Sequence, residues 1–178
     1  GAVSFAEEWM DHRLNCLKNY GIVDQDHVVW VGGNAKMNEF QAAMGLCNLR
    51  HIDAEIQKRK AVVERYRERL NGVEGIQLNP VQEHVMSNYA YFPVIFHEKQ
   101  FGFTRNEVHD RLAQENIFSR KYFYPLTNTY DCFHGAYDVS ETPVALEISR
   151  RVLTLPLYAD LPLEEVDHIC DIILGMRN

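Results

Sequence analysis

The stretch GNAKMNEFQAAMGL, residues 33–46, ends a loop and opens a helix. Gly32 and Gly33 let the backbone turn and approach a ligand or another chain closely. Asn38 has the side chain of an N-cap, and Gln41 lies three residues later, where a capping-box partner reaches back. The sequence therefore predicts a capped helix that begins directly after Asn38.

One side of this helix carries residues so small that another helix can approach it closely. These are Ala42, Ala43 and Gly45. A glycine inside a helix costs about 1 kcal/mol relative to alanine, so a packing reason for Gly45 is expected. We predict that residues 38–49 lie in a self-association interface. Asn34 and Lys36 precede the helix on a turn rich in donors, where an anionic group could be received.

Outward from this stretch, the pattern predicts an α+β fold. Helices are expected at about 7–19, 38–70 with a bend near Asp53, 104–116, 142–151 and 162–175. Extended segments are expected at 2–5, 28–31, 75–78, 89–96, 118–124 and 152–157. Residues 1–50 contain too little sheet to close a domain and read as the end of a larger one. Residues 51–178 read as a small, mainly antiparallel sheet with flanking helices.

Several positions carry more specific expectations. Pro93 lacks a donor, which favours an edge strand or a bulge for 89–96. Thr104 opens a capping box, and Thr142 before a proline is typical of a helix start. The side chains predicted to face inward from the last three helices are Val108, Leu112, Ala145, Leu146, Ile148, Val166, Ile169, Cys170 and Ile173. Cys47 is also expected on an apolar, packed helix face.

Charge and composition exclude some classes of function. The net charge of −7 argues against a nucleic-acid partner, which requires a basic stripe. The basic cluster at 58–69 alternates with glutamates at helical spacing, such as Glu55 with Arg59 and Glu64 with Arg67, so a solvated helix face is expected. No apolar run approaches the roughly 20 residues that span a bilayer, and no signal peptide is recognisable. We expect no membrane association.

The cysteines and histidines point to a reducing compartment and to no metal. The four cysteines are far apart in the sequence and form no C-x-x-C pair. The eight histidines show no H-E-x-x-H spacing. We therefore expect a cytoplasmic protein without a metal site.

The residue 33–46 stretch resembles the G-x-N-x-[KR]-M-x-E-x-x-A-A-x-G segment of the DegT/DnrJ/EryC1/StrS sugar aminotransferases. Further matches in the same order cover nearly the whole chain, at 48–53, 58–66, 88–94, 120–126 and 153–157. The resemblance implies the carboxy-terminal part of a fold-type I enzyme with pyridoxal 5'-phosphate as cofactor. It also implies a homodimer with a shared active site, and a role in polysaccharide or antigen biosynthesis. The implied substrate is a nucleotide-linked keto-deoxy sugar, a dTDP-4-keto-6-deoxyhexose, with glutamate as the amino donor.

The resemblance assigns roles to particular residues. Asn34 matches the asparagine that reaches the cofactor phosphate of the neighbouring subunit; alternatively, it only tolerates an unusual turn. Lys36 is a phosphoryl contact or a solvated loop lysine. The substrate-binding candidates before Pro125 are Arg120, Lys121, Tyr122 and Tyr124. Because side chains alternate along an extended segment, one of the two tyrosines is expected in the core.

The family's Schiff-base lysine has no counterpart in this sequence. None of the six lysines, at 18, 36, 58, 60, 99 and 121, stands in the family's Ser/Thr-rich lysine motif. We therefore expect the chain to have no catalytic residue and no activity by itself. An alternative from a different class remains open, a stand-alone dimerisation or binding module derived from such an enzyme.

Overall fold

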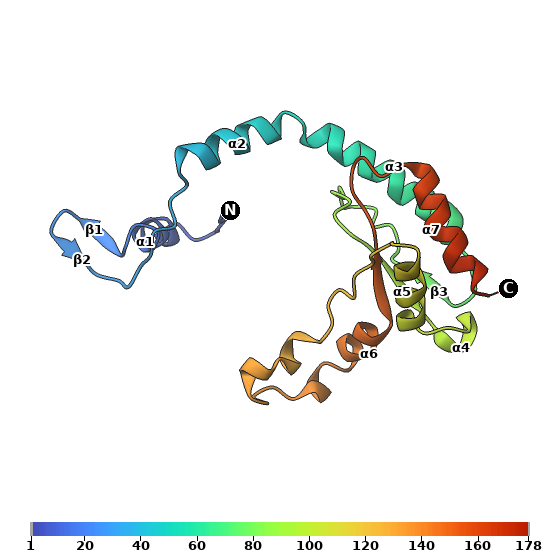
Figure 1. The fold of residues 1–178 in the computed structure, drawn as a ribbon. Helices are drawn as coiled ribbons and strands as arrows, with labels where there is room; N and C mark the ends of the chain where they lie inside the picture. The colour runs from blue at the N-terminus through green and yellow to red at the C-terminus, as the bar shows by residue number, and fades with distance from the viewer. Residues whose placement is uncertain (1, 178) are drawn as a thin grey trace. The chain divides into compact units, whose positions relative to one another are not determined.

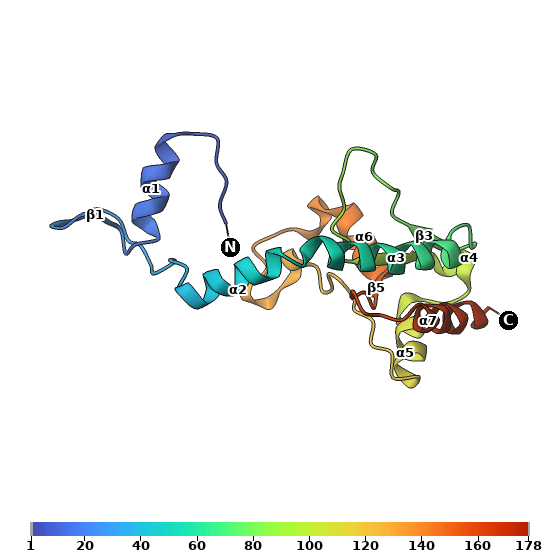
Figure 2. The same ribbon diagram turned by 90° about the horizontal axis from the view of Figure 1, so that it is seen from above.

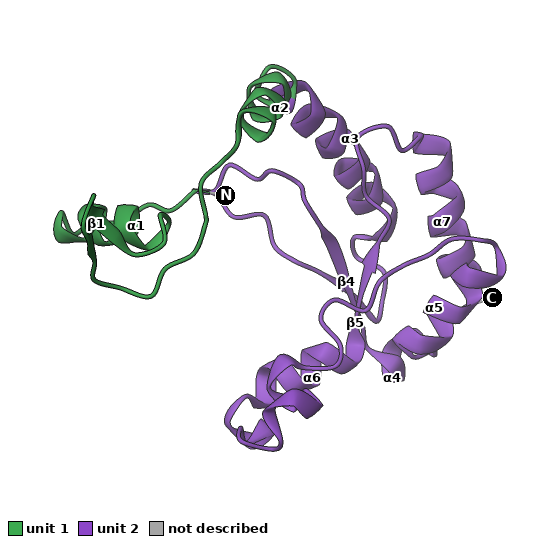
Figure 3. Cartoon of the chain, turned by 60° about the vertical axis from the view of Figure 1, so that its left-hand side comes forward, with its two compact units in different colours: residues 1–51 green, residues 52–178 purple. Residues whose placement is uncertain are grey.

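The computed structural model describes residues 2–177, and the chain divides into two compact units, Gly1–His51 and Ile52–Asn178 (Figure 3). This division lies one residue from the boundary expected from the sequence. The assignment of the first unit to the end of a larger domain stays a prediction. Each unit is described by itself below.

Unit 1 is two helices and a short hairpin: α1 Trp9–Leu17, β1 Ile22–Asp24, β2 His27–Val28 and α2 Glu39–Leu49 (Figure 1). The strand expected at residues 2–5 is wrong, since this segment is irregular. A lone extended segment without a partner strand does not form a sheet. Cys16 is the one buried apolar side chain among the described residues of this unit.

The helix expected at 38–70 is two helices, α2 and α3 Ile52–Leu70. The capping box of α2 is confirmed: Asn38 Oδ1 accepts the Gln41 N–H at 2.9 Å, and Gln41 Oε1 accepts the Asn38 N–H at 3.0 Å. The interruption falls at Arg50 and His51, whose N–H groups donate to carbonyls three residues earlier, a tighter turn than α-helix. The break thus lies close to the predicted bend.

No residue of α2 is buried in the described chain. Cys47 is exposed, so its expected core position is wrong. Phe40 and Met44 are 89% and 62% exposed. The apolar face that the sequence pattern identified therefore has no partner within the part of the chain that the structure describes.

Unit 2 is built on a three-stranded antiparallel sheet in the order β3-β4-β5. The strands are β3 Ile76–Leu78, β4 Phe92–Phe96 and β5 Val152–Leu155. The helices after α3 are α4 Glu98–Phe101, α5 Arg105–Gln114, α6 Pro143–Arg151 and α7 Leu163–Gly175, with 3-10 turns at Thr127–Thr129, Asp131–Phe133 and Val139–Glu141. Figures 1 and 2 show α7 running beside α3, and α7 also packs against α5. The α+β prediction with a small antiparallel sheet is confirmed.

Pro93 lies in the central strand, so the predicted edge position is wrong for β4 as a whole. It pairs with Thr154 of β5, and β3 pairs with β4 only from Val94 onward. Thr154 turns both its N–H and its carbonyl to Arg120 on the far side of β5. The nitrogen of Pro93, which carries no hydrogen, therefore points to the side where β3 has already ended. No hydrogen bond between strands is lost there.

One hydrophobic core lies between the sheet and its helices. It contains the predicted inward side chains of α5 and α7, namely Val108, Leu112, Val166, Ile169, Cys170 and Ile173. Tyr66 stacks on Phe92 with ring centres 4.9 Å apart, and its hydroxyl donates to the Pro156 carbonyl at 3.0 Å. Burial raises the pKa of the Cys170 thiol to about 12. In α6, Leu146 and Ile148 are half-buried, but Ala145 is exposed, so its inward prediction is wrong.

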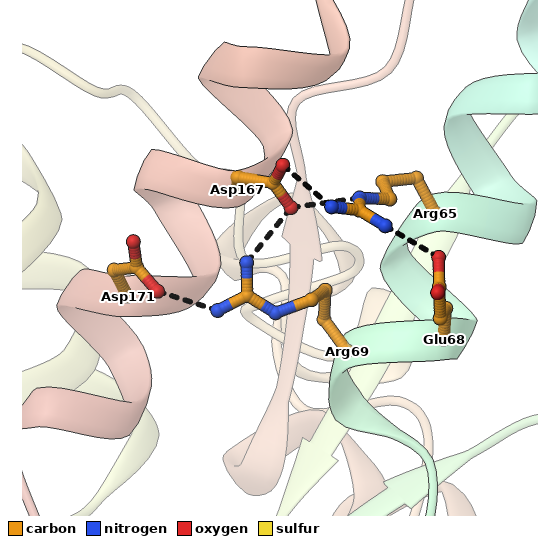
Figure 4. A network of polar contacts seen from close by, with 5 residues as sticks. All are labelled: Arg65, Glu68, Arg69, Asp167 and Asp171. Carbon is orange, nitrogen blue, oxygen red and sulfur yellow. Dashed lines mark hydrogen bonds and ion pairs between the residues drawn. The ribbon is translucent and has the colours of Figure 1, made fainter.

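The basic side of α3 is not simply a solvated face. Arg65 donates from Nε and Nη2 to both carboxylate oxygens of Asp167, each at 2.8 Å (Figure 4). Arg69 donates to Asp167 at 2.8 Å and also pairs with Asp171. Arg65 bonds Glu68 at 2.6 Å. The charge-assisted bonds to Asp167 and Asp171, bidentate between Arg65 and Asp167, join α3 to α7.

The two ion pairs expected from spacing are also wrong. Glu55 pairs with Lys58 at 3.1 Å, and Glu64 pairs with Lys60 at 3.6 Å. Arg59 and Arg67 instead donate to backbone carbonyls, those of Asn88 and Asn79 respectively. The two arginines therefore hold the ends of the loop that joins β3 to β4.

The α3–α7 network predicts a pH dependence of stability. Hydrogen bonds from Arg65 and Arg69 lower the pKa of Asp167 from 3.8 to about 2. A carboxylate with a lower pKa in the folded state stabilises above its unfolded pKa, and this contribution is lost as pH falls from about 4 toward 2. As pH falls through this window, the free energy of unfolding measured in urea should decrease more steeply for wild type than for Asp167→Asn. Asp110→Asn, at an exposed site on α5, is the control and should keep the wild-type slope. Equal slopes for wild type and Asp167→Asn would contradict the role of the network.

Candidate functional site

The loop that carries Asn34 is held against the end of α1. The Gly33 N–H donates to the Leu17 carbonyl at 3.0 Å, and the Ala35 N–H donates to the Lys18 carbonyl at 2.9 Å. These bonds satisfy carbonyls that a helix end leaves without partners. Residue 32 must be glycine for a steric reason, because a Cβ there would lie 2.6 Å from the Leu17 carbonyl oxygen. At Gly33, by contrast, a Cβ would meet nothing within 4 Å among the described residues.

Asn34 and Lys36 lie together on this loop, and both side chains are exposed. Asn34 Oδ1 accepts the Lys36 N–H at 3.4 Å, and no described residue accepts a hydrogen bond from its Nδ2. The Lys36 ammonium donates to Asn19 Oδ1 at 2.7 Å and lies 5.2 Å from the Tyr20 ring centre. Lys36 is therefore held in place, and the Asn34 amide is available as a donor.

A cavity of about 710 Å³ lies beside this loop within unit 1. Its polar lining includes Lys18, Lys36 and Asp11, and its apolar lining includes Phe5 and Met37. Asn34 does not line it. The cavity is therefore lined by Lys36 but not by Asn34.

Arg120 and Tyr122 form a second cluster, in unit 2, along the edge of β5 that faces away from β4. Arg120 exchanges both backbone hydrogen bonds with Thr154, at 2.9 and 2.7 Å. Its Nη1 donates to the Tyr122 hydroxyl at 2.7 Å. The Tyr122 ring meets Tyr91 edge to face at 5.4 Å. Together with Phe118 these side chains line a cavity of about 200 Å³ that presents one cation and aromatic surface.

Tyr124 lies apart from this cluster, over the guanidinium of Arg105. The Arg105 Cζ is 4.6 Å from the ring centre, within the range of a cation–π contact. Arg105 is only 3% exposed, whereas Tyr124 is 54% exposed. Burial lowers the pKa of Arg105 from its ordinary value, and Tyr124 opposes that shift.

The structure therefore brings some sequence-predicted residues together and separates others. Arg120 joins Tyr122, and Asn34 joins Lys36. Lys121 is half-buried and has no hydrogen bond or ion pair within residues 2–177. The expectation that one tyrosine is in the core is wrong, because Tyr122 is half-buried over Arg120 and Tyr124 is exposed.

Sequence reasoning missed two residues of these clusters. Arg105 lies within the capping box predicted at Thr104; that box is present, with Glu107 accepting the Thr104 N–H at 2.8 Å. Tyr91 was read only as part of a strand. An arginine at a helix start is the one local signal that could have drawn attention to Arg105, because a cation is unfavourable there.

Across residues 2–177, no three His, Cys, Asp or Glu side chains are grouped so that they could hold a metal ion. No helix in the described part of the chain has the length and apolar character needed to cross a membrane.

Comparison with known proteins establishes the family. Residues 1–174 match the DegT/DnrJ/EryC1/StrS aminotransferase family, and the chain belongs to it. It is 38% identical over 177 residues to a dTDP-4-amino-4,6-dideoxy-D-glucose transaminase of Escherichia coli, covering 98% of this chain and 47% of that protein. The enzyme of the same name from Shigella dysenteriae is 32% identical, with coverage of 99% and 48%.

Solved structures of sugar aminotransferases share the fold. The crystal structure of DesI in the presence of its TDP-sugar product has a TM-score of 0.82 and 26% identity, covering 93% of this chain and 42% of DesI. The putative sugar aminotransferase Spr1654 of Streptococcus pneumoniae, in its PMP form, has a TM-score of 0.82 at 23% identity, covering 97% of this chain and 46% of that one. The sequence-based fold and family predictions are confirmed. The chain spans about half the length of the curated relatives it matches.

Proposed function

We propose that this chain is one part of a pyridoxal-phosphate-dependent aminotransferase that acts on a nucleotide-linked keto-deoxy sugar. The observation that carries the proposal is the 38% identity over 98% of the chain to a dTDP-4-amino-4,6-dideoxy-D-glucose transaminase. The proposed substrate is accordingly a dTDP-4-keto-6-deoxyhexose, with glutamate as amino donor. Because all four cysteines are free thiols, we place the protein in the cytoplasm.

The described residues fit a supporting role toward the cofactor. Pyridoxal phosphate, when bound, supplies the electron sink for amino transfer. The Asn34 amide, exposed and with a donor to spare, fits a hydrogen bond to its phosphate. Lys36 adds a fixed positive charge on the same loop, which suits phosphoryl oxygens. The reactive amine is proposed to come from outside these residues.

The second cluster fits the nucleotide-sugar. Arg120 and Lys121 supply positive charge for a diphosphate, and Tyr122 and Tyr124 supply ring faces and hydroxyls. Among these four, Arg120 and Tyr122 are already held against each other at 2.7 Å. We propose that this pair is the main contact of unit 2 with substrate.

A homodimer with a shared active site is the proposed assembly, and α2 is its proposed interface. Phe40, Met44, Leu46 and Leu49 are all exposed on α2 in the described chain. Exposed apolar side chains on both sides of a helix favour a protein–protein contact. The small side chains at Ala42, Ala43 and Gly45 allow a close approach.

Gly45→Leu should weaken this dimer. A Cβ at Gly45 would meet nothing within 4 Å in the described chain, so the larger side chain disturbs no contact among residues 2–177. Against a partner helix it overpacks the contact, at a cost of about 1–3 kcal/mol. Analytical ultracentrifugation of the full-length protein measures the loss of dimer affinity. Gly45→Ala should lower the dimer affinity less than Gly45→Leu does. An unchanged dimer affinity for Gly45→Leu would remove α2 from the interface.

The function itself is tested with the full-length protein and dTDP-4-keto-6-deoxyglucose. Glutamate should be converted to 2-oxoglutarate in step with formation of the 4-amino sugar, detected by mass spectrometry. The GDP-linked keto sugar is the matched control for the nucleotide and should react more slowly. Dimerisation and dTDP binding without any amino sugar would favour the binding-module alternative and overturn the proposed reaction.

A further inference from the structure

The guanidinium of Arg105 is buried at the N-terminus of α5, where a positive charge is energetically unfavourable. Arg105 is the first residue of α5, at the end of a helix whose dipole disfavours cations. It is 3% exposed, and no carboxylate pairs with it within the part of the chain that the structure describes. A well-packed apolar side chain is often no worse for stability than such a buried charge. The role of the guanidinium therefore follows from its contacts.

Those contacts join three segments that are distant in sequence. Nη1 donates to the Val152 carbonyl at 2.9 Å, where α6 ends and β5 begins. Nε donates to Asn106 Oδ1 at 2.8 Å, within α5. The face of the guanidinium lies under the ring of Tyr124. Two hydrogen bonds thus fix the orientation of the cation on which Tyr124 rests.

Tyr124 has few other restraints. Beyond Arg120, which pairs with β5, no backbone N–H of residues 121–124 donates a hydrogen bond within residues 2–177. Tyr122 is held by Arg120 and Tyr91. Tyr124 is more than half exposed, so packing does not fix its ring. The Arg105 guanidinium is its one cation–π contact in the described chain.

We propose that Arg105 is a positioning residue for substrate binding, which acts by holding the Tyr124 ring in place. This inference rests on the proposed function, in which Tyr124 contacts the nucleotide-sugar. Arg105 itself does not touch the substrate. Its removal changes how readily the loop adopts its binding conformation and leaves the reacting groups unchanged.

Steady-state kinetics of the full-length protein test this proposal. Arg105→Met should raise KM for the nucleotide-linked keto sugar about tenfold, as expected for loss of one cation–π contact. The kcat should stay within about twofold, because the lost contact acts on binding. Arg111→Met is the matched control, since Arg111 lies on the same helix in a pair with Glu115 at 2.8 Å. It should leave KM unchanged.

A double-mutant cycle shows whether Arg105 acts through Tyr124. In a Tyr124→Leu background, Arg105→Met should change KM by less than about twofold, since the partner ring is gone. A tenfold increase in both backgrounds would overturn the proposal, as would an unchanged KM in the single variant. If Arg105→Met does not fold, Arg105→Gln replaces it, because it keeps a donor for the Val152 carbonyl and removes the cation; the same rise in KM is expected.

A spectroscopic measurement tests whether Arg105 positions Tyr124 independently of the proposed function. In protein labelled with 3-fluorotyrosine, the Tyr124 resonance is assigned by its absence from Tyr124→Phe. Arg105→Met should move that ¹⁹F resonance toward the free amino-acid value, and Arg111→Met should not. If wild type fails to aminate any nucleotide-linked keto sugar, the proposed function fails. An unmoved Tyr124 resonance in Arg105→Met would overturn the positioning role whatever the kinetics show.

Discussion

Residues 1–178, incubated with pyridoxal phosphate, glutamate and a dTDP-linked keto sugar, should form no amino sugar. No lysine should carry the cofactor in stoichiometric amount after borohydride reduction. A lysine must be deprotonated to attack a carbonyl group. Hydrogen bonds to Asp160 and Glu55 raise the pKa of Lys58, which keeps it protonated. Lys60 pairs with Glu64, and Lys36 donates to Asn19.

Peptide mass spectrometry after reduction is the measurement for this prediction. Low, scattered labelling of exposed lysines is expected, as for any protein with surface amines. The full-length protein, treated identically, is the positive control and should carry the cofactor on one lysine outside these residues. A stoichiometric adduct on a single lysine of residues 1–178, together with turnover, would contradict the assignment of this chain to a supporting role.

Asn34→Ala in the full-length protein should weaken pyridoxal phosphate binding about tenfold to a hundredfold. A hydrogen bond to a charged group is worth about 1.5–3 kcal/mol, which corresponds to this range of affinity. The fold should be unaffected, because the exposed Asn34 side chain loses only a 3.4 Å contact with the Lys36 N–H. Asn34→Asp should weaken binding further, because a carboxylate repels the phosphate.

Spectroscopic titration with pyridoxal phosphate gives the dissociation constants. Asn15→Ala is the matched control, since Asn15 is an exposed asparagine that bonds only within α1. It should bind the cofactor as wild type does. If Asn34→Ala also binds as wild type, Asn34 is a turn residue and has no part in the cofactor site.

The parts of the fold that depend on neighbours in sequence could be predicted. Both capping boxes, at Asn38 and Thr104, follow from side chains that bond backbone groups three residues away. The buried face of α7 follows from its helical periodicity. The extended segment at residues 2–5 shows the limit of this reasoning, because a strand exists only where another strand pairs with it.

Contacts between distant residues could not be predicted in the same way. Arg65 was assigned to solvent because its sequence neighbours are glutamates, but its bidentate partner Asp167 lies 102 residues away. Pro93 was assigned to an edge because periodicity does not reveal where a neighbouring strand ends. Cys47 was assigned to a core because an apolar helix face looks the same whether its partner is in the chain or outside it.

In the candidate site too, contacts between sequence neighbours could be predicted and contacts between distant residues could not. The proximity of Arg120 and Tyr122, and of Asn34 and Lys36, follows from their closeness in sequence. The pairing of Tyr124 with Arg105 does not, because alternation along a strand fails once the segment leaves the sheet beyond Arg120. The family motif drew attention to residues 120–126, and tertiary packing decided what each side chain there contacts.

The proposed shared site requires that this chain completes the cofactor site of a neighbouring subunit. Asn34→Ala subunits are mixed with subunits in which the reactive lysine is replaced, at limiting pyridoxal phosphate. Heterodimers then contain one site with both groups intact and one with neither. Activity should rise above that of either parent in proportion to the heterodimer, as quantified by native mass spectrometry. No recovery in verified heterodimers, with cofactor binding weakened in Asn34→Ala, would mean that Asn34 acts within its own subunit and would contradict the shared site.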